Sequence, residues 1–249
     1  MIGIIIQART GSTRLPNKML LPFYKGKGIL ETILKRLTSA ELNIPIILAT
    51  TVNSQDDKIE YIAQQNNVKV YRGSEDNVME RFIMAAEENN IQKIIRICAD
   101  NPFLDIEAIK FQIKNFKESD VDYWCYSKSD KTPTIITHYG FWTEGVKLDA
   151  LKRILIKTNN SLYLEHVTNY IYSHTADFKI HYEQISREIE NVHDIRLTID
   201  TIEDFELSQK IYSTMINKIP FKSENIVLLV KDHPEWIQLM KNEINNNKK

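Results

Sequence analysis

Residues 3–18 read GIIIQARTGSTRLPNK and join a short apolar run to a long polar loop. The run at residues 3–6 predicts a buried β-strand, because uninterrupted apolar residues are typical of strands covered on both faces. The loop carries three cations, the last of them Lys18, and also Gly11, one of only seven glycines in the chain. Glycine lets backbone N–H groups approach a phosphate, and Arg and Lys side chains bind phosphate oxygens. The stretch therefore predicts an exposed, anion-binding loop after a strand.

The spacing of this loop leaves a plainer interpretation open. It has neither the G-x-x-x-x-G-K-[ST] spacing of a P-loop nor the G-x-G-x-x-G of a dinucleotide-binding fold, so it could be only a basic connection. The charge distribution favours a ligand. Residues 1–40 hold seven Lys and Arg side chains against one Glu, although the whole chain has a net charge of −1. A basic end on a nearly neutral protein indicates a local anion such as a polyphosphate.

Short apolar runs alternate with amphipathic patterns along the next hundred residues. Strands are predicted at residues 44–49, 68–71, 93–98 and 121–125, and helices at 30–37, 56–65, 77–88 and 104–116. Strands separated by helices indicate βαβ units and a mainly parallel sheet flanked by helices. We therefore expect an α/β fold whose ligands bind beyond the carboxyl ends of the strands.

The pattern weakens between about residues 130 and 190. Helices are expected at residues 148–156, 163–172 and 202–215, and strands at 178–182 and 197–200. We interpret residues 130–190 as an acceptor-binding or dimerisation segment inside one domain that spans residues 1–240. A polar tail, residues 241–249, is expected to fray at its end.

Composition excludes several classes of protein. The chain has 249 residues, of which 43% are hydrophobic and 26% charged, as in globular proteins. No apolar run approaches the roughly 18 residues that span a bilayer, and no secretory signal is recognisable. The net charge argues against a general nucleic-acid or membrane binder. Two cysteines cannot form a disulfide framework or a Cys-only zinc site, so we expect a cytoplasmic protein.

Six motifs occur in a fixed order along the chain and together resemble one enzyme family. They lie at residues 5–18, 49–57, 71–81, 96–105, 165–168 and 196–204. The series closely resembles the SpsF-like branch of the cytidylyltransferases, which are relatives of the CMP-sialic acid and CMP-Kdo synthetases. The resemblance covers nearly the whole chain and is weakest from about residue 126 to 160.

The resemblance implies a Rossmann-like nucleotidyltransferase fold with a small inserted segment. It implies an enzyme that transfers CMP from CTP to a sugar or sugar-like acid and releases pyrophosphate, for surface glycan or polysaccharide synthesis. Magnesium would be the cofactor. CTP, or another nucleoside triphosphate, and the acceptor would be the partners of a homodimer, without nucleic acid or membrane.

The resemblance also assigns roles to individual residues. The residues around the triphosphate would be those of the opening loop, Ala8, Arg9, Gly11, Ser12, Arg14 and Lys18. The nucleoside would be held by the motif after the third predicted strand, Arg72, Gly73 and Ser74. The catalytic residues would be Arg9, Lys18 and Asp100, and the metal would lie between Asp100 and Asp200.

The positions of the two aspartates are consistent with a metal site. Asp100 follows an apolar strand, Asp200 follows another predicted strand, and magnesium prefers oxygen ligands. Each could instead begin a helix as an N-cap or Asx turn. Asp105 and Asp204 are expected to be such helix-start residues. The strand residue Cys98 is expected to be a small apolar filler.

One departure and two rival functions remain open. Relatives often have a Gly-Leu-Asp-Val-Glu-like run, whereas residues 140–144 place Trp142 at the aspartate and keep Glu144. Trp142 could line a less polar acceptor pocket or lie in a subunit or subdomain contact.

A glycosyltransferase would need an Asp-x-Asp motif after a strand, and the nearest match, residues 120–122, precedes one. A degenerate relative that only binds a nucleotide is the other alternative.

Overall fold

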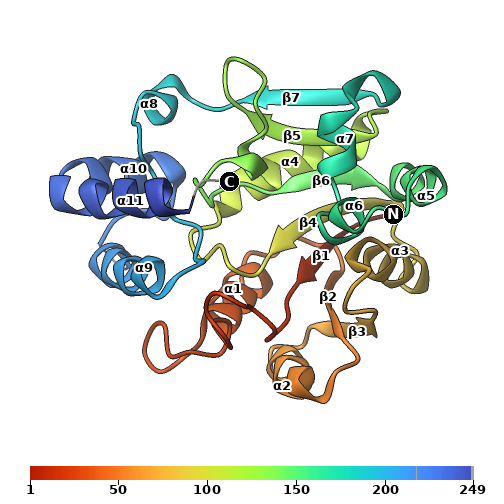
Figure 1. Cartoon of the computed structure of the whole chain (residues 1–249), viewed down its shortest axis with the longest axis horizontal. Helices are drawn as coiled ribbons and strands as arrows, with labels where there is room; N and C mark the ends of the chain where they lie inside the picture. Colours follow the sequence, from red (N-terminus) through yellow and green to blue (C-terminus); the bar gives the residue numbers. More distant parts are fainter. Residues whose placement is uncertain (217, 248–249) are drawn as a thin grey trace.

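A computed structural model describes residues 1–216 and 218–247 of the chain, and Figure 1 labels its elements. Within these residues, seven strands form one sheet in the order β3-β2-β1-β4-β6-β5-β7. Their bounds are β1 Ile2–Gln7, β2 Ile46–Thr51, β3 Lys69–Gly73, β4 Lys93–Cys98, β5 Tyr123–Ser127, β6 Glu144–Lys147 and β7 Ile180–Gln184. Only β6 runs antiparallel to its neighbours β4 and β5 in the described sheet, so the predicted, mainly parallel α/β sheet is confirmed.

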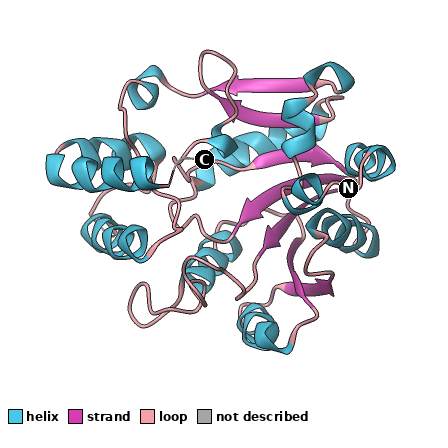
Figure 2. Cartoon of the chain, viewed as in Figure 1, coloured by secondary structure: helices cyan, strands magenta, loops and turns pink. Residues whose placement is uncertain are grey.

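Helices cover both faces of the sheet (Figure 2). One core contains side chains of α1 Ile29–Thr38, α2 Asp57–Gln65, α4 Ile106–Glu118, α8 Arg187–Glu190, α9 Ile202–Met215, α10 Ser223–Lys231 and α11 Pro234–Asn246. The helices on the other face are α3 Val78–Glu88, α5 Leu148–Lys157, α6 Ser161–Glu165 and α7 Asn169–Ser173. Ile4 and Ile6 of β1 belong to the first core and Ile5 to the second, which explains the uninterrupted apolar run. No helix among the described residues has the length and apolar character needed to cross a membrane.

The order of the strands creates a crevice beside β1. The chain builds β2 and β3 on one side of β1 and then returns to place β4 on the other side. Gln7 at the end of β1 pairs with Cys98 at the end of β4, so the two parallel strands stop at the same edge. The loops that follow them leave the sheet side by side, at the switch point where open α/β sheets bind ligands.

Several elements differ from the sequence-based prediction. The helix expected at residues 163–172 is divided into α6 and α7, because His166 adopts φ −99° and ψ 59°, outside the helical region. The strand expected at residues 197–200 does not form. There the N–H groups of Leu197 and Ile199 donate to the carbonyls of His138 and Asp100, which belong to loops.

A third difference is strand β6, which sequence periodicity missed. Only Val146 among its four residues is a strongly apolar strand former, so the pattern of buried strands is absent. Residues 241–246, expected to be part of the polar tail, are the last residues of α11. Asn247 is the C-cap residue of that helix, and the last two residues of the tail, 248–249, lie outside the described part of the chain.

Candidate active site

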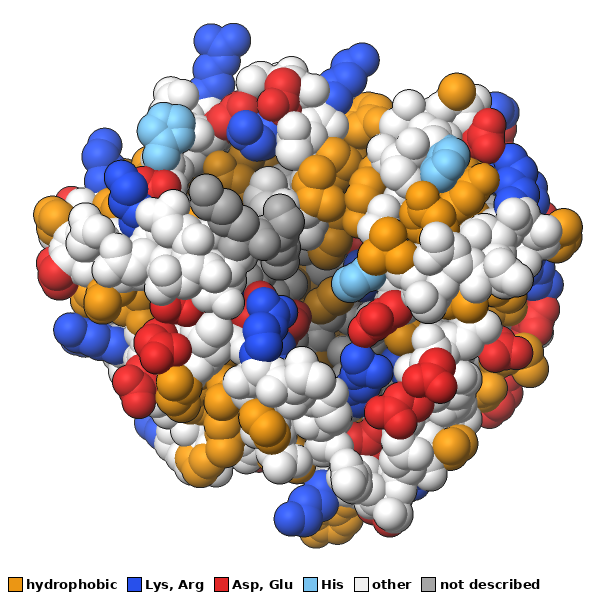
Figure 3. Space-filling view, viewed as in Figure 1, with side chains coloured by type: hydrophobic (Ala, Val, Ile, Leu, Met, Phe, Trp, Pro, Cys, Tyr) orange, Lys and Arg blue, Asp and Glu red, His pale blue; other side chains and the backbone are white. Residues whose placement is uncertain are grey.

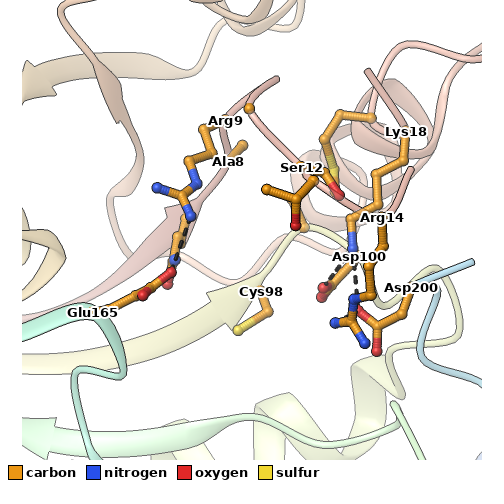
Figure 4. Close-up of a pocket in the computed structure, with 14 residues that line it drawn as sticks. Ala8, Arg9, Ser12, Arg14, Lys18, Cys98, Asp100, Glu165 and Asp200 are labelled. Carbon is orange, nitrogen blue, oxygen red and sulfur yellow. Dashed lines mark hydrogen bonds and ion pairs between the residues drawn. The ribbon is translucent and has the colours of Figure 1, made fainter. Parts of the chain in front are cut away.

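A cavity of about 330 Å³ opens at the carboxyl ends of β1 and β4 (Figure 4). Charged side chains of both signs lie along the lower side of the hollow on this face (Figure 3). Its lining includes every predicted triphosphate and metal residue, namely Ala8, Arg9, Gly11, Ser12, Arg14, Lys18, Asp100 and Asp200. The fold thus brings together residues that lie up to 192 positions apart in the sequence.

The opening loop is folded back on itself by its own backbone. The carbonyl of Thr10 accepts the N–H groups of both Ser12, at 2.8 Å, and Asn17, at 3.2 Å. Asn17 has φ 58°, a left-handed conformation that glycine and asparagine tolerate best. A methyl group added at Gly11 would come within 3.3 Å of a Glu75 oxygen. These constraints direct the chain so that Lys18 turns towards the end of β4.

Lys18 is buried beside the two aspartates. Its ammonium group donates to Asp100 at 3.1 Å and to the carbonyl of Ile199 at 2.5 Å, and lies 3.6 Å from an Asp200 oxygen. Burial acts to lower the pKa of Lys18, but the two carboxylates outweigh it and the pKa is raised. Lys18 therefore stays cationic at neutral pH. The expectation of an exposed loop lysine is wrong, because the residue is only 8% exposed.

The two arginines of the loop are also ion-paired. Arg14 lies 2.8 Å from an Asp200 oxygen, on the same side of the cavity as Lys18. Arg9 reaches the opposite side and lies 3.0 Å from Glu165 at the end of α6 (Figure 4). Glu165 was not among the predicted site residues, although it begins the motif at residues 165–168 and that motif was the signal that could have found it. Each of the three cations of the loop is thus ion-paired with a carboxylate that lines the cavity.

Neither Asp100 nor Asp200 is the N-cap residue of the helix that follows it. Asp105 caps α4 by accepting the N–H groups of Glu107 and Ala108, as expected. At α9 the capping box is made by Thr201 and Asp204. The carboxylates of Asp100 and Asp200 point instead at Lys18 and into the cavity.

These two aspartates fit a magnesium ion. Among the described residues, no group of three or more His, Cys, Asp or Glu side chains is arranged to hold a metal ion. Magnesium commonly uses one or two protein carboxylates and completes its shell with water and substrate phosphates. Both carboxylates approach the same ammonium group, so a cation already sits where their oxygens converge. The donor set therefore suits a metal that arrives with a phosphate.

The predicted nucleoside residues lie two strands away from β1 and outside the lining of this cavity. The Arg72 guanidinium, at the end of β3, pairs with Asp57 at 2.7 Å and Glu60 at 2.8 Å. Ser74 accepts the N–H of Asn77 at the start of α3. Their contact with a nucleoside, and that of Gly73, remains a prediction.

A buried ion pair lies under the cavity and ties α6 and α7 to the sheet. Arg96 on β4 and Glu144 on β6 are 2.5 Å apart, and both are almost fully buried. Glu144 also accepts a hydrogen bond from Thr168, between α6 and α7, at 2.8 Å. Glu144 is thus a structural carboxylate that fixes the segment carrying Glu165. Cys98, expected to be an apolar filler, is instead half-buried and lines the cavity.

Trp142 packs inside its own chain. Its ring lies 5.3–5.8 Å from the rings of Tyr126, Tyr139 and Phe141, and the residue is 8% exposed. It also borders a small separate cavity with Asn101, next in sequence to Asp100. The Trp142 indole is therefore part of the hydrophobic core.

Replacing Trp142 by aspartate is expected to lower the free energy of unfolding by about 3–5 kcal/mol. The change removes a large buried ring and leaves a charge among aromatic side chains. Urea denaturation measures the loss, and Trp142→Phe, which keeps an aromatic ring, serves as the matched variant. Unchanged stability of Trp142→Asp together with altered sedimentation would contradict this and place Trp142 in a subunit contact.

Two known proteins are similar in sequence to nearly the whole chain. The chain is 39% identical over 207 residues to the uncharacterised protein MJ1063 of Methanocaldococcus jannaschii, covering 82% of this chain and 79% of that protein. It is 30% identical over 239 residues to the spore coat polysaccharide biosynthesis protein SpsF of Bacillus subtilis, covering 94% and 95% of the two chains.

Solved structures give the same picture. A cytidylyltransferase from Leptospira borgpetersenii superposes with a TM-score of 0.81 at 30% identity, covering 95% of this chain and 96% of the other. A CMP:2-keto-3-deoxy-manno-octonic acid synthetase complexed with CTP gives a TM-score of 0.63 at 13% identity, covering 86% and 98%, and shares the fold. Residues 3–228 match the cytidylyltransferase family. The expected fold and resemblance are confirmed, and the chain belongs to the cytidylyltransferase family.

Proposed function

We propose that this protein transfers CMP from CTP to a sugar or sugar-like acid and releases pyrophosphate. The observation that carries the proposal is the cavity at the switch point, where Arg9, Arg14 and Lys18 face Asp100 and Asp200. Cations that bind phosphates and carboxylates that bind a hard cation are the two groups that nucleotidyl transfer requires.

The chain's own residues act by positioning and by charge. Arg14 and Lys18 bind the β- and γ-phosphates and stabilise the charge that develops on the leaving pyrophosphate. Arg9 approaches from the other side of the cavity, and the backbone of Gly11 and Ser12 lies close to the phosphates. Holding the acceptor oxygen in line with the α-phosphorus then lowers the barrier by orientation.

Asp100 and Asp200 would hold magnesium beside the α-phosphate. When bound there, the metal polarises phosphoryl oxygens and neutralises charge. Asp100 and Asp200 also orient Lys18, since both lie within 4 Å of its ammonium group.

A metal-dependent glycosyltransferase is less well supported. Its signature would be two aspartates at a strand end, and the candidate pair lies before β5. Asp120 pairs with Lys147 and Lys179, and Asp122 with Arg153, so these carboxylates form ion pairs away from the cavity. The degenerate, non-catalytic alternative is less well supported, because the predicted metal residues Asp100 and Asp200 line the cavity together with the triphosphate residues.

We further propose a cytoplasmic homodimer that acts in polysaccharide biosynthesis. The SpsF relative is named for such a pathway, and this chain spans 95% of its length. Exposed apolar side chains on α5 and α6, Ile156 and Leu162, lie in the segment expected to form the subunit contact.

The reaction can be tested by pyrophosphate release. Each of the four nucleoside triphosphates is paired with a panel of sugar acids and sugar phosphates, with magnesium and with EDTA. We expect release only with CTP, magnesium and one acceptor class. Release that persists in EDTA would refute the metal mechanism, and release with a different triphosphate would refute CTP as donor.

A further inference from the structure

A buried carboxylate outside the cavity holds the opening loop from behind. One oxygen of Asp56 accepts both the N–H and the hydroxyl of Thr10, each at 2.7 Å. Its other oxygen accepts the hydroxyl of Thr51, at the end of β2, at 2.5 Å. Asp56 is 2% exposed and Thr10 is 5% exposed, so this contact is shielded from water.

The side chain of Asp56 does not serve the helix at whose start it stands. Asp56 occupies the N-cap position of α2, where an aspartate usually accepts N–H groups of the first turn. Here it makes no such bond and is turned towards Thr10. The threonine donors hold the pKa of Asp56 below its usual value although burial opposes this, so the group accepts as an anion.

The contact extends from Asp56 into the anion-binding loop. Thr10, fixed by Asp56, offers its carbonyl to the N–H groups of Ser12 and Asn17. Ser12 follows Gly11 in the cavity lining, and Asn17 precedes Lys18. One carboxylate thus determines where both ends of the loop lie.

We propose that Asp56 is a positioning residue that holds the loop of residues 10–18 in the conformation that receives the triphosphate. It touches neither the cavity nor its contents and acts through Thr10. The nucleotide part of this inference rests on the proposed function, whereas the part concerning loop order does not.

A nearby buried cation must be separated from this role. Arg81 on α3 is 1% exposed, and burial together with repulsion from Arg9 lowers its pKa to about 10, whereas Asp56 and Glu75 act to raise it. Removing Asp56 therefore also removes a counter-charge, and Asp56→Asn separates the two effects because it removes the charge and keeps an acceptor for Thr10. A second control must weaken the hydrogen bonding of the same carboxylate without freeing the loop. Thr51→Val deletes one bond to Asp56 and keeps the bonds to Thr10.

Three variants test the proposal by two measurements. Asp56→Ala deletes the acceptor. Asp56→Asn keeps an oxygen for Thr10 and offers an amide to the Thr51 hydroxyl, which can accept. Hydrogen exchange of the loop amides is followed in the ligand-free protein, and the Kd for CTP is measured by calorimetry with magnesium, each beside Thr51→Val.

We expect Asp56→Ala to speed exchange at Ser12 and Asn17 by about tenfold or more and to weaken CTP binding by about tenfold, because bonds to a charged acceptor are lost. Asp56→Asn should stay within about threefold of wild type. Thr51→Val should leave both readouts unchanged even if it unfolds more easily. Equal loop exchange in Asp56→Ala and Thr51→Val would overturn the proposal. Absence of CTP binding by the wild type would refute the proposed function but not the role of Asp56, because hydrogen exchange of the loop amides still tests that role.

Discussion

Asp100→Asn is expected to lower the rate of CMP transfer by about 10²- to 10³-fold. A neutral amide is a poor ligand for a hard cation, and a bound metal ion stabilises the transition state by several kcal/mol. The same change should tighten CTP binding in EDTA a few-fold, since it removes a negative charge and releases Lys18 from its 3.1 Å contact. The benefit of magnesium for CTP affinity should largely disappear. Calorimetry with and without magnesium measures both effects.

The matched control is Asp149→Asn, which removes the same charge from an exposed helix start. It should leave CTP affinity and rate unchanged in both conditions. If Asp100→Asn kept full activity, or kept the wild-type dependence on magnesium, Asp100 would not be a metal ligand.

Lys18→Ala is expected to lower kcat/KM for CTP by about 10²- to 10³-fold, the usual consequence of losing one preorganised donor to a developing negative charge. Because Lys18 is buried between two carboxylates, the variant should also lose about 1–3 kcal/mol of stability. Steady-state kinetics and urea denaturation, run on the same preparation, separate the two effects.

Lys114→Ala is the control for Lys18→Ala, since Lys114 is an exposed lysine on α4. It should change neither kinetics nor stability. A folded Lys18→Ala enzyme with wild-type kcat/KM would remove Lys18 from the triphosphate site.

Sequence alone placed Lys18 and Asp100 correctly at one edge of the sheet. The prediction succeeded because both follow apolar strands, and parallel neighbouring strands end at a common edge. The opening motif added Arg9 and Arg14, which also line the cavity. Local pattern and strand direction were sufficient for these residues.

The residues that sequence missed depend on contacts over long separations. Glu165 faces Arg9 only because α6 is tied to β6 through Thr168 and Glu144. The sequence predicts Asp56 only as the first residue of a helix, and the structure shows that its carboxylate accepts hydrogen bonds from Thr10 instead. Such pairings depend on tertiary packing, which leaves no periodic signal in the chain.

The central claim is that the cavity between β1 and β4 holds the nucleoside triphosphate. The most direct test is to titrate CTP, with magnesium, into the wild type and into Lys18→Ala. We predict one CTP per chain for the wild type and affinity weakened by about tenfold or more in the variant, as expected for a lost charge-assisted contact. Equal affinity in the two folded proteins, or no binding by the wild type, would contradict the account.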